Sequence, residues 1–189
     1  MVTGAFRNDS EKAGSVMVED ARWQKQRMLS NGVLTLDAED LRRLLPLSKS
    51  RILIDQVISL QPGRMAVAQK AVSGGDSQRA GNQVDFVFPS TTAMSALEQL
   101  SCVVLLSAAL PEKDIASAWK SDTGMMLPRV VEIENLEVDT EMVVPGILHL
   151  RVTLIREVDA ETCLFEGGVS VAGVDFIRAR WLMGEIPQR

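Results

Sequence analysis

The sequence predicts an α+β domain in which one long apolar helix covers one face of an antiparallel sheet. The helix is expected at about 93–110, and its second half, 100–110, contains no charged residue, which is typical of a helix buried on most sides. It is preceded by a short helix and a hairpin. It is followed by four strand-like segments separated by turn residues, at 130–138, 147–158, 162–171 and 174–183.

Length and composition are those of one globular domain. The chain has 189 residues, of which 46% are hydrophobic and 24% charged, so wholesale disorder is excluded. The net charge of -5 and the 4% aromatic content argue against a general nucleic-acid binder, which would be basic and would stack bases on aromatic rings. The first residues contain no signal-peptide run, and no stretch reaches the length of a membrane span, so we expect a cytoplasmic protein.

Cysteine and histidine are scarce. Cys102 and Cys163 are too few for a disulfide framework, and we expect both to be buried reduced thiols. The single histidine, His149, excludes a site with several histidine ligands within one chain, and no metal or other cofactor is expected. His149 falls in a strand-like segment and is interpreted as a sheet residue rather than a catalytic one.

The N-terminal third is expected to contain a polar extension, a short helix and a hairpin. Residues 1–35 are assigned to the extension, with a weak helical signal at 18–29, and 36–189 to the domain. Asp37 is the expected N-cap of a helix that carries a Leu41, Leu44, Leu45 stripe and ends at Pro46. Strands are expected at 52–60 and 65–72, on either side of a turn at 61–64.

The middle of the chain leads into the long helix. A loop is expected at 74–82 and a short strand at 84–88, which Pro89 ends. Ser90-Thr91-Thr92 supplies hydroxyl groups for the helix start. After the helix, 112–127 is expected to be a connection with helical turns near 115–119.

The order of these segments resembles that of the FabZ-type 3-hydroxyacyl-acyl-carrier-protein dehydratases. The resemblance rests on Leu41-Arg42-Arg43-Leu44-Leu45-Pro46, on 51–57, on Gln61-Pro62-Gly63, on 143–152 and on Gly173-Val174 with the strand after it. It implies a hotdog fold, a curved antiparallel sheet wrapped round one central helix. It also implies side-by-side pairing into a homodimer or higher oligomer, and an acyl thioester, carried by acyl-carrier protein or coenzyme A, bound beside the helix.

The resemblance fails at one catalytic position. Phe88-Pro89 is similar to the family motif, but Val87 stands where that family has its catalytic histidine. Glu98, in Leu97-Glu98-Gln99-Leu100, corresponds to the family's helix carboxylate and is the catalytic candidate. The resemblance implies substrate contacts for five neighbours: Phe88, Pro89, Thr91, Thr92 and Gln99.

Three functions remain open. Dehydration needs an acid and a base, and only Glu98 is retained. Thioester hydrolysis needs one carboxylate, with N–H groups near Thr91 at the helix start to bind the carbonyl oxygen. The favoured hypothesis is a divergent non-dehydratase member that binds acyl thioesters or pairs with an active homologue.

Several other residues have a structural and a functional interpretation. Asp55, Asp85 and Cys102 are interpreted as structural residues. Thr91 and Thr92 are interpreted as helix caps rather than catalytic residues. Arg42, Arg43, Lys49 and Arg51 form a basic cluster in an acidic chain. Such a cluster is either a docking patch for an acidic carrier protein or an ordinary solvated face.

Overall fold

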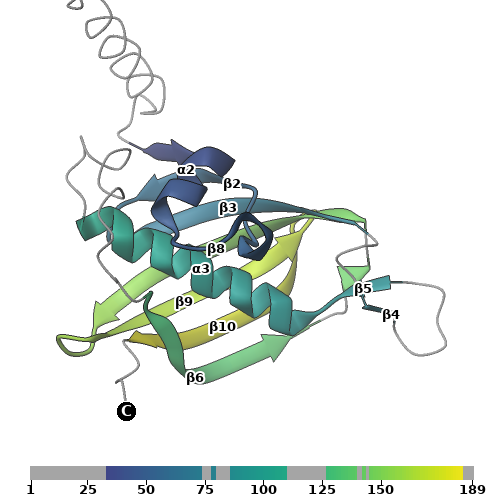
Figure 1. The fold of residues 1–189 in the computed structure, drawn as a ribbon. Coiled ribbons are helices and arrows are strands. Elements are labelled where there is room, and N and C mark those ends of the chain that lie inside the picture. The colour runs from purple at the N-terminus through teal and green to yellow at the C-terminus, as the bar shows by residue number, and fades with distance from the viewer. Residues whose placement is uncertain are drawn as a thin grey trace, which may run out of the picture.

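The computed structural model describes residues 33–73, 78–79, 86–109, 127–139, 142–143 and 145–184. A seven-stranded sheet in the order β1-β2-β3-β8-β9-β10-β6 forms one layer, and every strand pairs antiparallel with its neighbour. Figure 1 shows the helix α3 (Ser90–Ala109) lying across one face of this sheet. This is the α+β hotdog arrangement that the sequence predicts.

The bounds of the strands follow the sequence patterns closely in the second half of the chain. Those of the large sheet are β1 (Leu34–Leu36), β2 (Gln56–Gln61), β3 (Met65–Val72), β6 (Arg129–Val138), β8 (Gly146–Glu157), β9 (Thr162–Val171) and β10 (Val174–Gly184). The four strands expected after the long helix are confirmed as β6, β8, β9 and β10. β1 lies at the boundary that the sequence places between extension and domain.

The short helix α2 (Ala38–Leu44) begins at the predicted cap. The Asp37 carboxylate accepts hydrogen bonds from the N–H groups of Glu39 and Asp40, and the Asp40 side chain accepts one from the N–H of Asp37. This reciprocal capping box satisfies donors that the first helical turn leaves unpaired. The predicted stripe of Leu41, Leu44 and Leu45 is fully buried.

The hairpin of β2 and β3 is confirmed, but its first strand begins later than predicted. Residues 52–54 are not in a strand, and the 3-10 helix η1 (Lys49–Arg51) precedes them. The turn is held against α3, because the N–H of Gly63 donates to the carbonyl oxygen of Val104 at 3.0 Å. Gly63 has φ +66°, and its Cα faces the Cβ of Ala108, so a side chain here would be both strained and crowded.

A second, three-stranded sheet joins two short strands that precede α3 in the chain to one that follows it. It consists of β4 (Gln78–Arg79), β5 (Phe86–Phe88) and β7 (Met142–Val143), in the order β4-β5-β7. β4 lies in the segment that the sequence analysis assigns to a loop, and a strand of two residues is too short to show periodicity. The helix α3 starts at Ser90, three residues before the predicted position. The signals at 18–29 and 115–119 lie outside the described residues.

The core lies between α3 and the inner face of the sheet. Leu97, Leu100 and Val103 of the helix are fully buried, as are Leu150 of β8 and Trp181 of β10. By length and hydropathy Ser90–Ala108 is the one described stretch that meets the requirements of a membrane span, and 61% of it is buried inside the fold. A core helix satisfies the same criteria, and this helix occupies the core.

Candidate functional site

A pocket of about 260 Å³ opens beside α3. Its walls come from three parts of the chain: the segment around η1, one face of α3, and the residues that lead into β6. They contribute Leu47, Arg51 and Leu53, then Ser95, Glu98, Gln99 and Cys102, then Leu127, Pro128 and Arg129. Five of these ten described residues are polar or charged, so the pocket combines an apolar surface with groups that can contact a polar or charged part of a ligand.

The helix contributes four residues at helical spacing. Ser95, Glu98, Gln99 and Cys102 follow one another at i, i+3, i+4 and i+7, so they share one face of α3. Neighbours on the opposite side, such as Leu97 and Leu100, are in the core. The candidate carboxylate, Glu98, therefore lies on the pocket side of the helix.

Glu98 is engaged by β6. Its Oε1 accepts a hydrogen bond from Nε of Arg129 at 2.8 Å and a second one from the backbone N–H of Val130 at 3.2 Å. The Glu98 side chain is 18% exposed, whereas that of Arg129 is 54% exposed. Both bonds fall on Oε1, so a carboxylate that serves as general base would first have to leave these partners or act through Oε2.

Gln99 connects α3 to the segment before β2. Its Oε1 accepts a hydrogen bond from the N–H of Leu53 at 2.8 Å, and its Nε2 donates to the carbonyl oxygen of Arg51 at 2.8 Å. The side-chain amide thus pairs with the backbone as a neighbouring strand would. This contact explains why residues 52–54 remain outside the sheet despite their strand-like sequence.

Cys102 is a buried thiol and not a nucleophile. Its Sγ donates to the carbonyl oxygen of Pro128 at 3.3 Å. Burial, and after it the negative charge of Glu98, raise the pKa of the thiol to about 12. Because the thiolate is the reactive form, burial and the raised pKa of Cys102 favour its structural interpretation.

The remaining predicted substrate contacts lie before the pocket along the chain. Phe88 is buried at the end of β5, and Pro89 is half-buried. Thr91 is exposed and Thr92 half-buried in the first turn of α3, inside the helix rather than before it. Seven residues separate Thr91 from Glu98, which is about 10 Å along a helix axis, so none of the four lines the pocket with Glu98.

His149 and Asp55 lie away from this pocket. His149 is half-buried in β8 between Leu148 and Leu150, which face the core, so its ring lies on the opposite face of the sheet. There it lines a polar hollow of about 640 Å³. The Asp55 carboxylate accepts a hydrogen bond from the N–H of Ala71 at 2.6 Å, a structural role. Asp85 lies outside the described residues, and the side chain of Val87 is not described.

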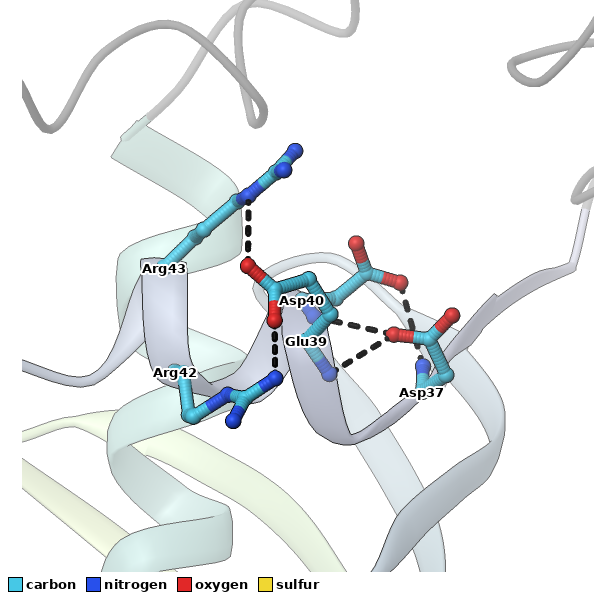
Figure 2. Close-up of polar contacts among 5 residues, drawn as sticks. All are labelled: Asp37, Glu39, Asp40, Arg42 and Arg43. Carbon is cyan, nitrogen blue, oxygen red and sulfur yellow. Dashed lines mark hydrogen bonds and ion pairs between the residues drawn. The ribbon is translucent and has the colours of Figure 1, made fainter. Parts of the chain in front are cut away.

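The basic cluster is largely neutralised where it lies on α2. Arg42 and Arg43 both pair with the carboxylate of Glu39, and Figure 2 shows the two guanidinium groups on either side of it. With Asp37 and Asp40, the α2 region carries three acidic and two basic side chains. The solvated-face interpretation therefore fits Arg42 and Arg43. Lys49 and Arg51 remain as exposed cations of η1.

Two pocket features were not among the predicted site residues. Ser95 lies three residues before Glu98, so helical spacing alone would have placed it on the same face. Arg129 lies 31 residues from Glu98 along the chain, and no local pattern in the sequence pairs them. Among the described residues no cluster of three or more histidine, cysteine or acidic side chains is arranged to hold a metal.

Comparison with curated proteins shows similarity to one family. The chain is 30% identical over 109 residues to the 3-hydroxyacyl-[acyl-carrier-protein] dehydratase FabZ of Moorella thermoacetica, a match that covers 57% of this chain and 76% of that protein. The FabZ proteins of Latilactobacillus sakei and Geobacillus thermodenitrificans match over 52% and 51% of their own lengths. No family model matches the chain.

Solved structures share the fold. The dehydratase heterocomplex ApeI:P from Xenorhabdus doucetiae contains a chain with a TM-score of 0.60 and 18% identity, covering 78% of this chain and 91% of that one. A hypothetical thioesterase protein with coenzyme A from Streptococcus pneumoniae has a TM-score of 0.50 and 12% identity, covering 70% and 86%. At these identities the likeness establishes the hotdog fold and leaves the chemistry to the site.

Proposed function

This chain belongs to the FabZ family of 3-hydroxyacyl-[acyl-carrier-protein] dehydratases, and we propose that it is a divergent member that binds acyl thioesters without dehydrating them. The thioester, carried by acyl-carrier protein or coenzyme A, would enter the pocket beside α3. The leucine side chains of that pocket, Leu47, Leu53 and Leu127, offer an apolar surface to the acyl chain.

The ion pair of Glu98 with Arg129 is the observation that supports a non-dehydratase most directly. Dehydration requires one group to remove the α-proton and another to protonate the departing hydroxyl. Glu98 is the one carboxylate among the described residues of the pocket wall, and its Oε1 already accepts hydrogen bonds from two donors. The described residues supply no second group to the pocket, because His149 lies on the other face of the sheet, and the resemblance implies Val87 at the position of the family's catalytic histidine.

We propose the edge strand β6 as the surface through which this protein pairs with another chain. β6 is a ten-residue strand at the edge of the sheet, and four of its apolar residues are between 43% and 49% exposed: Val131, Ile133, Leu136 and Val138. An exposed, long, apolar edge is a template for another strand. The similar chain in the dehydratase heterocomplex ApeI:P supports pairing with another chain as a proposal for this protein. We therefore include a second copy or an active homologue as candidate partners.

Turnover of an acyl-thioester panel would test the proposal. Saturated, 2-enoyl and 3-hydroxyacyl forms would be offered on coenzyme A and on carrier protein to the wild type and to Glu98→Gln, with products followed by mass spectrometry. We expect retention of ligand without turnover. Release of free thiol that Glu98→Gln abolishes would replace the proposal with a thioesterase, and hydration of the enoyl form would restore the dehydratase.

A further inference from the structure

The pocket beside α3 carries one cation that no described residue compensates. Its charged wall residues are Glu98, Arg129 and Arg51. Glu98 and Arg129 pair with each other, so their charges cancel locally. Among the described residues Arg51 has neither an ion pair nor a side-chain hydrogen bond. The pocket is therefore locally positive in a chain whose net charge is -5.

The backbone holds Arg51 firmly in position. Its N–H donates to the carbonyl oxygen of Ser48 at 2.8 Å, and its own carbonyl oxygen accepts a hydrogen bond from Nε2 of Gln99 at 2.8 Å. The residue ends η1 and is tied to the helix face that carries Glu98. The exposed side chain thus extends from a fixed point in the pocket wall, and only the side chain must be ordered when an anion binds.

Leucine side chains beside a guanidinium group that extends from a fixed backbone suit a ligand with an apolar chain and an anionic group. Guanidinium groups bind phosphate through two parallel hydrogen bonds, which an ammonium group cannot reproduce. We propose that Arg51 binds the phosphate of a phosphopantetheine arm whose acyl end enters the pocket. The inference rests on the proposed function, because it specifies which part of the acyl carrier the pocket recognises.

A comparison of ligands with and without phosphate would test it. Non-hydrolysable thioethers of pantetheine, phosphopantetheine and coenzyme A, each with hexyl, decyl and hexadecyl chains, would be titrated calorimetrically into four proteins. These are the wild type, Arg51→Gln, Arg51→Lys and Lys49→Gln. Lys49 is the matched control, since it is an exposed cation of the same 3-10 helix that does not line the pocket.

We expect Arg51→Gln to weaken binding of phosphopantetheine and coenzyme A ligands about tenfold or more, the usual effect of removing a hydrogen bond to a charged group. The affinity of Arg51→Lys for these ligands should lie between those of the wild type and Arg51→Gln. The affinity of Lys49→Gln should equal that of the wild type. Pantetheine ligands, which lack the phosphate, should bind the wild type and Arg51→Gln alike. Binding of a decyl thioether attached to carrier protein, compared between the wild type and Arg51→Gln, would then show whether Arg51 also contacts the phosphate on that carrier.

Each contrary result has a separate meaning. If all ligands bind and Arg51→Gln affects the phosphorylated and unphosphorylated ones equally, the phosphate contact is refuted while acyl binding stands. If no ligand of any chain length binds the wild type, the proposed function fails and takes the inference with it. Circular dichroism of each variant would confirm that all four proteins are folded.

Discussion

The thiol of Cys102 carries a prediction about pH. Burial, followed by the negative charge of Glu98, raises its pKa from the ordinary value of 9.0 to about 12. A thiol is neutral when protonated, so the folded state holds this proton more tightly than the unfolded chain. Its contribution to stability is complete below pH 9 and should be lost between pH 9 and about 12, by roughly 1.4 kcal/mol per pH unit.

Urea unfolding of the wild type and Cys102→Ala between pH 8 and 10.5 would check this loss. The variant should be less stable at pH 8, because it leaves a cavity, and should depend less steeply on pH above 9. Cys163→Ala is the control, because the expectation that both thiols are buried is wrong for Cys163, which is only half-buried although burial also raises its pKa. Equal slopes for Cys102→Ala and the wild type would contradict the assignment to Cys102.

The ion pair of Glu98 and Arg129 carries a second prediction at the residue scale. Because Arg129 is half-exposed, we expect a coupling free energy of only about 0.5 kcal/mol between the two side chains. A double-mutant cycle with Glu98→Gln, Arg129→Gln and the double variant, followed by urea unfolding, would measure it. A coupling several times larger would mean that the pair is a main support of β6 and not simply a local contact.

At the scale of the elements, local patterns in the sequence predict the elements that carry their own periodicity. The helix α3 and the strands β6, β8, β9 and β10 are long enough to show period 3.6 or period 2, and the capping box of α2 has its own local signature. The pattern fails at 52–54, where the apolar run Ile52, Leu53 and Ile54 predicts a strand that the structure does not contain. Their backbone partner is the side chain of Gln99, 46 residues from Leu53 along the chain.

The prediction at this scale concerns the contribution of Gln99 to the free energy of unfolding. Gln99→Leu would leave the N–H of Leu53 and the carbonyl oxygen of Arg51 without partners, and we expect a loss of about 1–3 kcal/mol in the free energy of unfolding. Gln56→Leu is the control, because it removes an exposed side-chain hydrogen bond to Gln69. Urea unfolding should show little change for Gln56→Leu. Equal losses in the two variants would contradict the connecting role of Gln99.

The residues of the candidate site likewise fall into a group that the sequence predicts and a group that it does not. The resemblance to the family singled out Glu98, and helical spacing extends it to Ser95 and Cys102 on the same face. The opposite wall comes from Arg51 and Arg129, which reach the pocket only when the chain has folded. Tertiary contacts of that kind leave no periodic trace in a single sequence, so the charge balance of the pocket could not be predicted.

For the whole molecule, the edge strand β6 leaves apolar side chains exposed to solvent at one end of the sheet. Three of its exposed apolar residues lie opposite buried residues of β10 in the register of the sheet: Ile133 opposite Trp181, Leu136 opposite Ala179 and Val138 opposite Ile177. They therefore share the inner face of the sheet but extend past the cover of α3. A second sheet edge with its own helix would bury them, and the other edge, β1, has only three residues.

We therefore expect the protein to be a dimer in solution and Leu136→Lys to shift it towards the monomer, since a charge in the joined sheet would have to be buried. Sedimentation velocity across a concentration series would measure the shift. Val174→Lys is the matched control, because Val174 is 63% exposed at the β9–β10 turn, away from β6. A wild-type monomer at all concentrations would leave pairing with a homologue as the role of β6, and a Leu136→Lys dimer as stable as the wild type would place the interface elsewhere.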